Sequence, residues 1–186
     1  MKQKRVVMFG DSLTDYFPMN KLQDLPVEFI NRGVAGDTIP EMKARVQYDV
    51  ISYNPDVILM QGGANDFQMS LYRGYKIVAG QLVNLAKKIR ESLPQTEIYI
   101  ESLYPAYTRR IGLMPSWAKE KSNEEIRKIN GEIERLCVLE NFPYVNMYER
   151  LADKNGELPL DYTMDGIHLQ EKAYDIVSEW IHEVIK

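Results

Sequence analysis

Ser12 has the residue type and the sequence position of a catalytic nucleophile. It follows Gly10 and Asp11, directly after an apolar run at residues 5–9. A glycine at the end of a strand permits a tight turn, and such a turn can expose the serine oxygen. A serine hydroxyl becomes a good nucleophile when a neighbouring base takes its proton. The same position also suits a helix N-cap, a role in which serine is common.

His168 and Asp165 could supply the base and the group that orients it. A neutral imidazole can accept the serine proton. Asp165 stands three residues before His168, so its carboxylate can bond the other ring nitrogen, fix the tautomer and stabilise the imidazolium. Each residue also has a structural interpretation. Asp165 could cap the last helix, and His168 could be a histidine whose hydrogen bonds are satisfied within the fold.

Acyl transfer at a serine also needs hydrogen-bond donors for the oxyanion of the tetrahedral intermediate. The candidates are the backbone N–H groups of Ser12 and Gly36 and the side-chain amide of Asn65. Gly36 suits this role because a backbone without a side chain lets a substrate approach closely. Gly33 and Gly36 could instead be simple turn glycines, and Asn65-Asp66 could form an Asx turn. Together, the candidates predict acyl transfer through a covalent acyl-enzyme intermediate.

The rest of the chain alternates between short β-rich runs and longer amphipathic segments. Strands are predicted at residues 5–9, 27–31, 56–60, 97–101 and 144–147. Apolar residues three and four apart predict helices that include residues 42–50, 77–89, 126–137 and 173–184. This alternation indicates right-handed βαβ units and a parallel sheet. Ligands of such sheets bind outside the carboxyl ends of the strands, so the candidate residues should converge on one rim.

Further residues near these segments are expected to contact a substrate. Four of them are Asp11, Phe67, Tyr104 and Ile167. A long loop at residues 104–117 follows the fourth strand and is expected to form one wall of the site, because long loops in compact domains are often functional. Its apolar side chains could equally pack on the domain or on a partner subunit. A facing wall is expected from Phe67, Met69, Leu71 and Tyr72.

Length and composition favour one domain over residues 1–186. About 45% of the residues are apolar, enough for a substantial core, and the net charge is −4. A mildly acidic chain argues against nucleic acid as the main partner, since phosphate binding needs a basic surface. No apolar run reaches the ~18 residues of a membrane span. We therefore expect a cytoplasmic protein, although homo-oligomer formation stays open.

The remaining chemistry-bearing residues suggest no other reaction. Cys137 is the single cysteine and sits at a helical spacing that faces inward, so it is expected to be a core residue. His, Cys and carboxylate residues do not show metal-ligand spacing, and no metal or cofactor is expected. Gly10-Asp11-Ser12 lacks the glycine run and the lysine of a phosphate-binding loop.

Four segments resemble the sequence blocks of the SGNH, or GDSL, hydrolase family. They are Gly10-Asp11-Ser12-Leu13, Gly36, Gly63-Ala64-Asn65-Asp66 and Asp165-Gly166-Ile167-His168, in the order that the family has them. The resemblance implies an α/β fold of the flavodoxin-like type, a three-layer α/β/α sandwich with a five-stranded parallel sheet. It also implies metal-independent ester hydrolysis by Ser12, Asp165 and His168, with Ser12, Gly36 and Asn65 as the oxyanion hole.

The expected substrate is a small acyl ester, acetyl or another short chain. Residues 161–169 are similar to members known as acetylhydrolases or carbohydrate esterases. Lysophospholipase and acyl thioesterase activities are alternatives, because the same catalytic set serves all three. A flavodoxin-like binding module is the alternative outside the enzymes, since fold alone does not decide function.

Overall fold

A computed structural model describes residues 3–68, 72–108 and 122–185, and its centre is a parallel sheet. The sheet has five strands in the order β2-β1-β3-β4-β5. Their bounds are β1 Arg5–Gly10, β2 Glu28–Gly33, β3 Val57–Met60, β4 Glu97–Glu101 and β5 Tyr144–Val145. All four strand pairs are parallel, so every strand ends at the same edge of the sheet.

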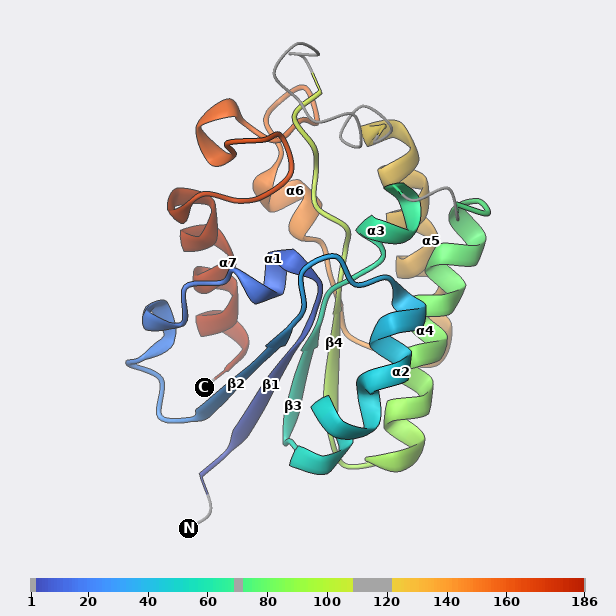
Figure 1. Ribbon diagram of the computed structural model, residues 1–186, viewed down its shortest axis with the longest axis vertical. Coiled ribbons are helices and arrows are strands. Elements are labelled where there is room, and N and C mark those ends of the chain that lie inside the picture. The colour runs from blue at the N-terminus through green and yellow to red at the C-terminus, as the bar shows by residue number, and fades with distance from the viewer. Residues whose placement is uncertain (1–2, 69–71, 109–121, 186) are drawn as a thin grey trace.

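Helices cover both faces of this sheet and complete a three-layer α/β/α arrangement (Figure 1). One face carries α2, α4 and α5, and the other carries α1 and α7. The longer helices are α2 Ile39–Asp49, α4 Tyr75–Ser92, α5 Asn123–Glu140 and α7 Glu171–Val184. The shorter ones are α1 Ser12–Asp15, α3 Ala64–Gln68 and α6 Met147–Leu151. Single 3-10 turns lie at Met19–Leu22, Ile51–Tyr53 and Leu160–Tyr162.

The alternation of side chains along the central strands builds a core on each face. In β1, Val7 and Phe9 join the cluster under α2, α4 and α5, whereas Val6 and Met8 join the cluster under α7. Each of these four side chains is at most 5% exposed. A strand buried on both faces is continuously apolar, which explains the unbroken hydrophobic run before the nucleophile candidate.

The predicted fold is confirmed, and the differences lie at the ends of its elements. β2 runs to Gly33 and pairs there with Gly10. β5 ends at Val145, because Asn146 caps α6 by accepting the Glu149 N–H. The short helices α1 and α3 were not predicted from periodicity, and they follow β1 and β3 closely at the carboxyl edge (Figure 1).

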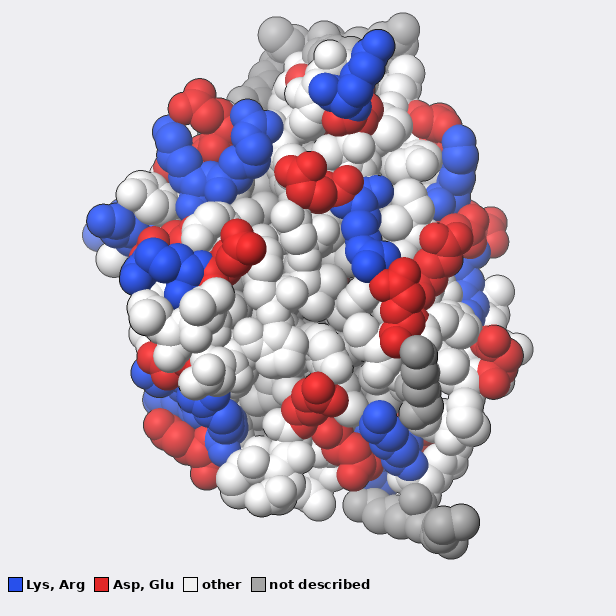
Figure 2. All heavy atoms as spheres, turned by 180° about the vertical axis from the view of Figure 1, so that it is seen from behind, with Lys and Arg blue, Asp and Glu red and all other residues white. Residues whose placement is uncertain are grey.

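Charged side chains are mixed on the face of the molecule seen from behind. Figure 2 shows acidic and basic groups interspersed around a largely uncharged centre. Ion pairs also join separate elements of the fold, as between Arg150 of α6 and Glu183 of α7 at 2.7 Å. None of the helices within the described ranges has the length and apolar character that crossing a membrane requires.

Candidate active site

The nucleophile and base candidates are in hydrogen-bond contact. Ser12 Oγ lies 3.0 Å from His168 Nε2, although 156 residues separate the two in the chain. On the other side of the ring, His168 Nδ1 lies 2.5 Å from Asp165 Oδ2. If Nδ1 carries the proton, Nε2 is an acceptor and the serine hydroxyl donates to it. The three side chains therefore form a continuous hydrogen-bonded chain.

Asp165 is held by its own loop and not by the last helix. Its Oδ1 accepts the backbone N–H groups of Ile167 and His168, at 2.9 and 2.8 Å. Burial raises the pKa of Asp165, but the hydrogen bonds from His168 and from those two N–H groups outweigh it and bring the pKa to about 2. Asp165 is therefore an anion throughout the neutral range, as an orienting group for a histidine should be.

Ser12 is the first residue of α1, and Asp11 is the cap before it. The Asp11 carboxylate accepts the Leu13 N–H at 3.0 Å. With Asp11 as the N-cap, the interpretation of Ser12 as the cap is wrong. Asp11 is also only 1% exposed and its carboxylate caps α1, while its predicted contact with substrate stays a prediction. The cap leaves the Ser12 hydroxyl available to His168.

Gly36 occupies a turn that only glycine adopts readily. The Asp37 N–H donates to the Val34 carbonyl at 3.2 Å and closes the turn. Gly36 is its third residue, with φ of +87°, and a Cβ built there would meet nothing within 4 Å. The side of Gly36 that a side chain would occupy is therefore open space, and a substrate could approach the backbone from it.

Asn65 and Asp66 tie α3 to the segment that follows this turn. Asn65 Nδ2 donates to the Asp37 carbonyl at 2.8 Å, and Asp66 Oδ2 accepts the Ile39 N–H at 2.9 Å. One hydrogen of the Asn65 amide is used in this bond, so the second is available to another acceptor. Burial raises the pKa of Asp66, which is 7% exposed.

The Gly36 turn is also bonded to the helix that carries Ser12. Asp15, the last residue of α1, accepts the Ala35 N–H through Oδ2 at 3.2 Å. Asn31 of β2 donates to the Thr14 carbonyl at 2.7 Å. Ser12, Gly36 and Asn65 thus come from three separate segments that are cross-linked by hydrogen bonds at the carboxyl edge of the sheet.

The other residues expected to bind substrate are buried. Phe67 and Ile167 are each 7% exposed, and Tyr104 is 8% exposed. Phe67 packs edge-on against Tyr72, with ring centroids 4.9 Å apart. Tyr104 donates its hydroxyl to Glu101 Oε2 at 2.5 Å. All three side chains belong to the core clusters, so they support the site from within and offer little open surface.

Only the start of the predicted loop wall is described. Residues 109–117, Met69 and Leu71 lie outside the described residues. The preceding segment is anchored beside the histidine loop, because the Tyr107 N–H donates to the Gly166 carbonyl at 2.8 Å. Thr108 Oγ1 donates to Glu157 Oε1 at 2.9 Å. The chain therefore enters the expected wall from a point next to Asp165 and His168.

Tyr16 was missed by sequence reasoning. Its ring lies 5.4 Å from the His168 ring, tilted by 54°, and the residue is 52% exposed. The signal for it was its position four residues after Ser12, which places it at the end of the same helical turn.

Glu101 is a buried acid at the end of β4. It is 5% exposed, and burial raises its pKa to about 7. The Tyr104 hydroxyl partly opposes this shift, and the neighbouring Asp11 carboxylate adds to it. Asp11, the N-cap of α1, therefore lies close enough to Glu101 to influence its protonation, and Glu101 is largely protonated below neutral pH.

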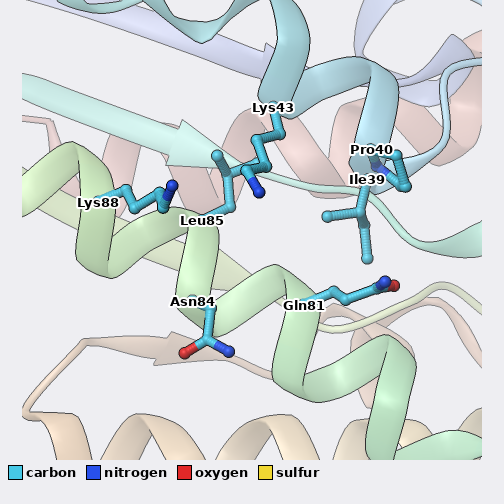
Figure 3. Close-up of a pocket in the computed structure, with 7 residues that line it drawn as sticks. All are labelled: Ile39, Pro40, Lys43, Gln81, Asn84, Leu85 and Lys88. Atoms are coloured by element: carbon cyan, nitrogen blue, oxygen red, sulfur yellow. The ribbon is translucent and has the colours of Figure 1, made fainter.

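A separate hollow lies between α2 and α4 (Figure 3). Its volume is about 210 Å³, and its lining consists of Ile39, Pro40, Lys43, Gln81, Asn84, Leu85 and Lys88. None of the candidate site residues lines it. Elsewhere, within the described ranges, no group of three or more His, Cys, Asp or Glu side chains could hold a metal ion. Cys137 is fully buried, as predicted.

Residues 8–176 match the model of the GDSL-like Lipase/Acylhydrolase family. A GDSL-like lipase from Bacteroides thetaiotaomicron superposes with a TM-score of 0.82 at 24% identity, over 98% of this chain and 87% of that one. A variant of an acetyl-xylooligosaccharide esterase from Geobacillus superposes with a TM-score of 0.75 at 17% identity, over 97% of this chain and 93% of that one.

A curated relative is larger. The N-acylneuraminate cytidylyltransferase of Escherichia coli is 23% identical over 182 residues, which cover 97% of this chain. The chain spans about 40% of the length of that relative.

The family model matches most of the chain, and this match identifies the class of protein. The chain belongs to the GDSL-like lipase/acylhydrolase family, whose members are carboxylic ester hydrolases. The family assignment favours a hydrolase over the flavodoxin-like binding module that the sequence left open.

Proposed function

We propose that this chain is a serine esterase that hydrolyses small acyl esters, with Ser12 as nucleophile, His168 as general base and Asp165 as the group that orients it. The observation that carries the proposal is the hydrogen-bonded chain from Ser12 Oγ through the His168 ring to Asp165, with separations of 3.0 and 2.5 Å. The 3.0 Å separation is a working distance for proton transfer between a nucleophile and its base, and the 2.5 Å separation is a hydrogen bond that orients the base.

In the first half of the reaction, Ser12 Oγ attacks the ester carbonyl carbon while its proton moves to His168 Nε2. The carbonyl electrons move onto oxygen, and the oxyanion accepts hydrogen bonds from the Ser12 and Gly36 N–H groups and from Asn65 Nδ2. Asp165 stabilises the imidazolium. When the carbonyl re-forms, the bond to the alkoxide breaks, and the His168 proton passes to the departing alcohol.

In the second half, water takes the place of the alcohol. His168 Nε2 removes a proton from the water, whose oxygen attacks the acyl carbon on Ser12. The second tetrahedral intermediate uses the same three donors. Its collapse returns the proton to Ser12 Oγ and releases the carboxylic acid, so the enzyme is regenerated and one water is consumed.

Acetyl or other short-chain esters of carbohydrates are the substrate class that we propose. Residues 161–169 are similar to acetylhydrolases and carbohydrate esterases. Two of the similar proteins, the acetyl-xylooligosaccharide esterase and the N-acylneuraminate cytidylyltransferase, carry names that denote carbohydrate substrates. Lysophospholipase and acyl thioesterase activities use the same catalytic set and are the alternatives to be distinguished by assay.

A fluorophosphonate probe tests the nucleophile directly. We expect one label per chain, located at Ser12 by peptide mapping, and no labelling of Ser12→Ala. Asp165→Asn should label much more slowly while it stays folded, because Asn has an oxygen for the Ile167 and His168 N–H groups but cannot stabilise an imidazolium. Labelling at another residue, or equal labelling of Ser12→Ala, would remove Ser12 from this role.

A further inference from the structure

Arg45 of α2 binds several segments of the site at once. Its side chain is 17% exposed, and its guanidinium lies over the Phe9 ring with 4.7 Å between the carbon and the ring centroid. The guanidinium donates to two backbone carbonyls and two carboxylates. These acceptors are the Gly10 and Arg32 carbonyls, both at 2.9 Å, Asp37 Oδ2 at 2.5 Å and Asp49 Oδ2 at 3.0 Å.

Two of these acceptors belong to the segments that carry the chemistry. Gly10 ends β1 two residues before Ser12, and its carbonyl also accepts the Val34 N–H at 3.0 Å. Asp37 directly follows Gly36, and its own carbonyl accepts Asn65 Nδ2 at 2.8 Å. Arg45 therefore connects the strand end before Ser12 with the turn that contains one proposed oxyanion donor, Gly36, and is hydrogen-bonded to another, Asn65.

The guanidinium group suits this task better than another cation. It is planar, stays charged at all relevant pH values and presents five N–H donors in a fixed arrangement. A lysine ammonium at the same place could keep the charge, but its flexible stem could not hold Gly10 and Asp37 in one geometry.

We propose that Arg45 is a positioning residue, which fixes the separation between the Ser12 segment and the Gly36 turn so that the oxyanion donors face the oxygen on which the negative charge develops. This inference rests on the proposed esterase function. Arg45 touches no reacting atom. It acts through Gly10 and Asp37, and its contribution is the alignment of donors that must be in place before charge develops on the substrate.

Asp49 supplies a matched control within the same cluster. It is the last residue of α2, is 7% exposed and binds both Arg45 and Arg32. No hydrogen bond described for its side chain reaches the Ser12 segment or the Gly36 turn. Asp49→Asn therefore weakens the Arg45 cluster from the side away from the chemistry, whereas Asp37→Asn weakens it on the side of the turn.

The test compares Arg45→Lys, Asp37→Asn and Asp49→Asn on p-nitrophenyl acetate, with kcat, KM and Tm measured for each and Ser12→Ala as the background. We expect Arg45→Lys and Asp37→Asn to lower kcat by roughly 10-fold to 100-fold, the range for a displacement of about 1 Å near a reacting centre. KM should change little. Asp49→Asn should lower Tm by about as much as the other two variants do. Its kcat should stay within about twofold of wild type, because Asp49 contacts no reacting group.

Two results would overturn the inference. One is a wild-type kcat in both Arg45→Lys and Asp37→Asn. The other is a kcat loss that follows the Tm loss equally in all three variants, because that pattern indicates a purely structural role. If Arg45→Lys does not fold, the pair Asp37→Asn and Asp49→Asn decides alone. Absence of Ser12-dependent turnover in the wild type would overturn the proposed function itself, and this inference with it.

Discussion

Asn65 and Ser12 make separable contributions to the proposed reaction. Ser12 forms the covalent bond, whereas Asn65 only donates a hydrogen bond to the oxyanion. Asn65→Ala should therefore lower kcat by roughly 10²–10³-fold, the usual cost of losing one oxyanion donor. Steady-state kinetics on p-nitrophenyl acetate measure this. Since Asn65 also bonds the Asp37 carbonyl, Tm is recorded in parallel, and a rate within threefold of wild type would remove Asn65 from the oxyanion hole.

Glu101 predicts a pH dependence of stability. Because burial raises its pKa from 4.5 to about 7, the folded protein binds this proton more tightly than the unfolded chain does. This proton binding adds to the free energy of unfolding. The added stability is fully present below about pH 4.5 and is lost as the pH rises through about 7. Thermal unfolding of wild type and Glu101→Gln across this range measures it.

The variant should gain Tm relative to wild type as the pH rises, because glutamine keeps an acceptor for the Tyr104 hydroxyl and never ionises. A difference in Tm that stays constant from pH 4.5 to 8 would show that Glu101 does not titrate in this way.

The residue types in the sequence predicted the catalytic candidates, but they did not predict the residues that hold those candidates in place. Ser12, Asp165 and His168 were predictable because nucleophile, orienting acid and base are rare residue combinations at strand ends. The capping role of Asp11 was not predicted, since the sequence cannot distinguish a carboxylate that caps α1 from one that faces substrate. Arg45 was missed because an arginine within an amphipathic helix usually faces solvent, and its four acceptors come from distant parts of the chain.

The short helix α1 depends on close contact with β2. A Cβ at Gly33 would lie 2.1 Å from the Asp15 backbone nitrogen, so no side chain fits there unless α1 moves. Gly33→Ala should therefore destabilise the protein by about 1–3 kcal/mol, as overpacking does, and should displace Ser12. Chemical denaturation and the esterase rate measure the two effects.

Gly80 of α4 is the matched control, because a Cβ there meets nothing within 4 Å. Gly80→Ala should stabilise the protein by about 0.5–1 kcal/mol through helix propensity and leave the rate unchanged. If Gly33→Ala were as stable and as active as Gly80→Ala, the contact between α1 and β2 would not position the nucleophile.

Element prediction succeeded where periodicity extends over several turns. α4, α5 and α7 have 14 to 18 residues, and their apolar positions are unmistakable. α1 and α3 have four and five residues, too few to show a period of 3.6. Their formation depends on capping and tertiary bonds, such as the one from Ile39 to Asp66, which a single sequence does not reveal.

The whole molecule explains why this edge of the sheet carries the site. In the order β2-β1-β3-β4-β5, the chain leaves β1 toward one side of the sheet and leaves β3 toward the other. Such a switch in direction opens a crevice at the carboxyl ends of the two strands. Ser12 follows β1 and Asn65 follows β3, so the proposed nucleophile and one proposed oxyanion donor flank the crevice. The parallel α/β sandwich could be predicted from the sequence, whereas the strand order that creates this crevice could not be read from the alternation of strands and helices.

The most direct test of the account is hydrolysis of p-nitrophenyl acetate, butyrate and octanoate by wild type and Ser12→Ala. We expect turnover that falls steeply with chain length and drops by on the order of 10⁶-fold in the variant, as for a triad that acts as a unit. Ser12-dependent turnover that favours octanoate would keep the mechanism and move the substrate class to lipids or acyl thioesters. Hydrolysis that is equal in wild type and Ser12→Ala would contradict the central claim.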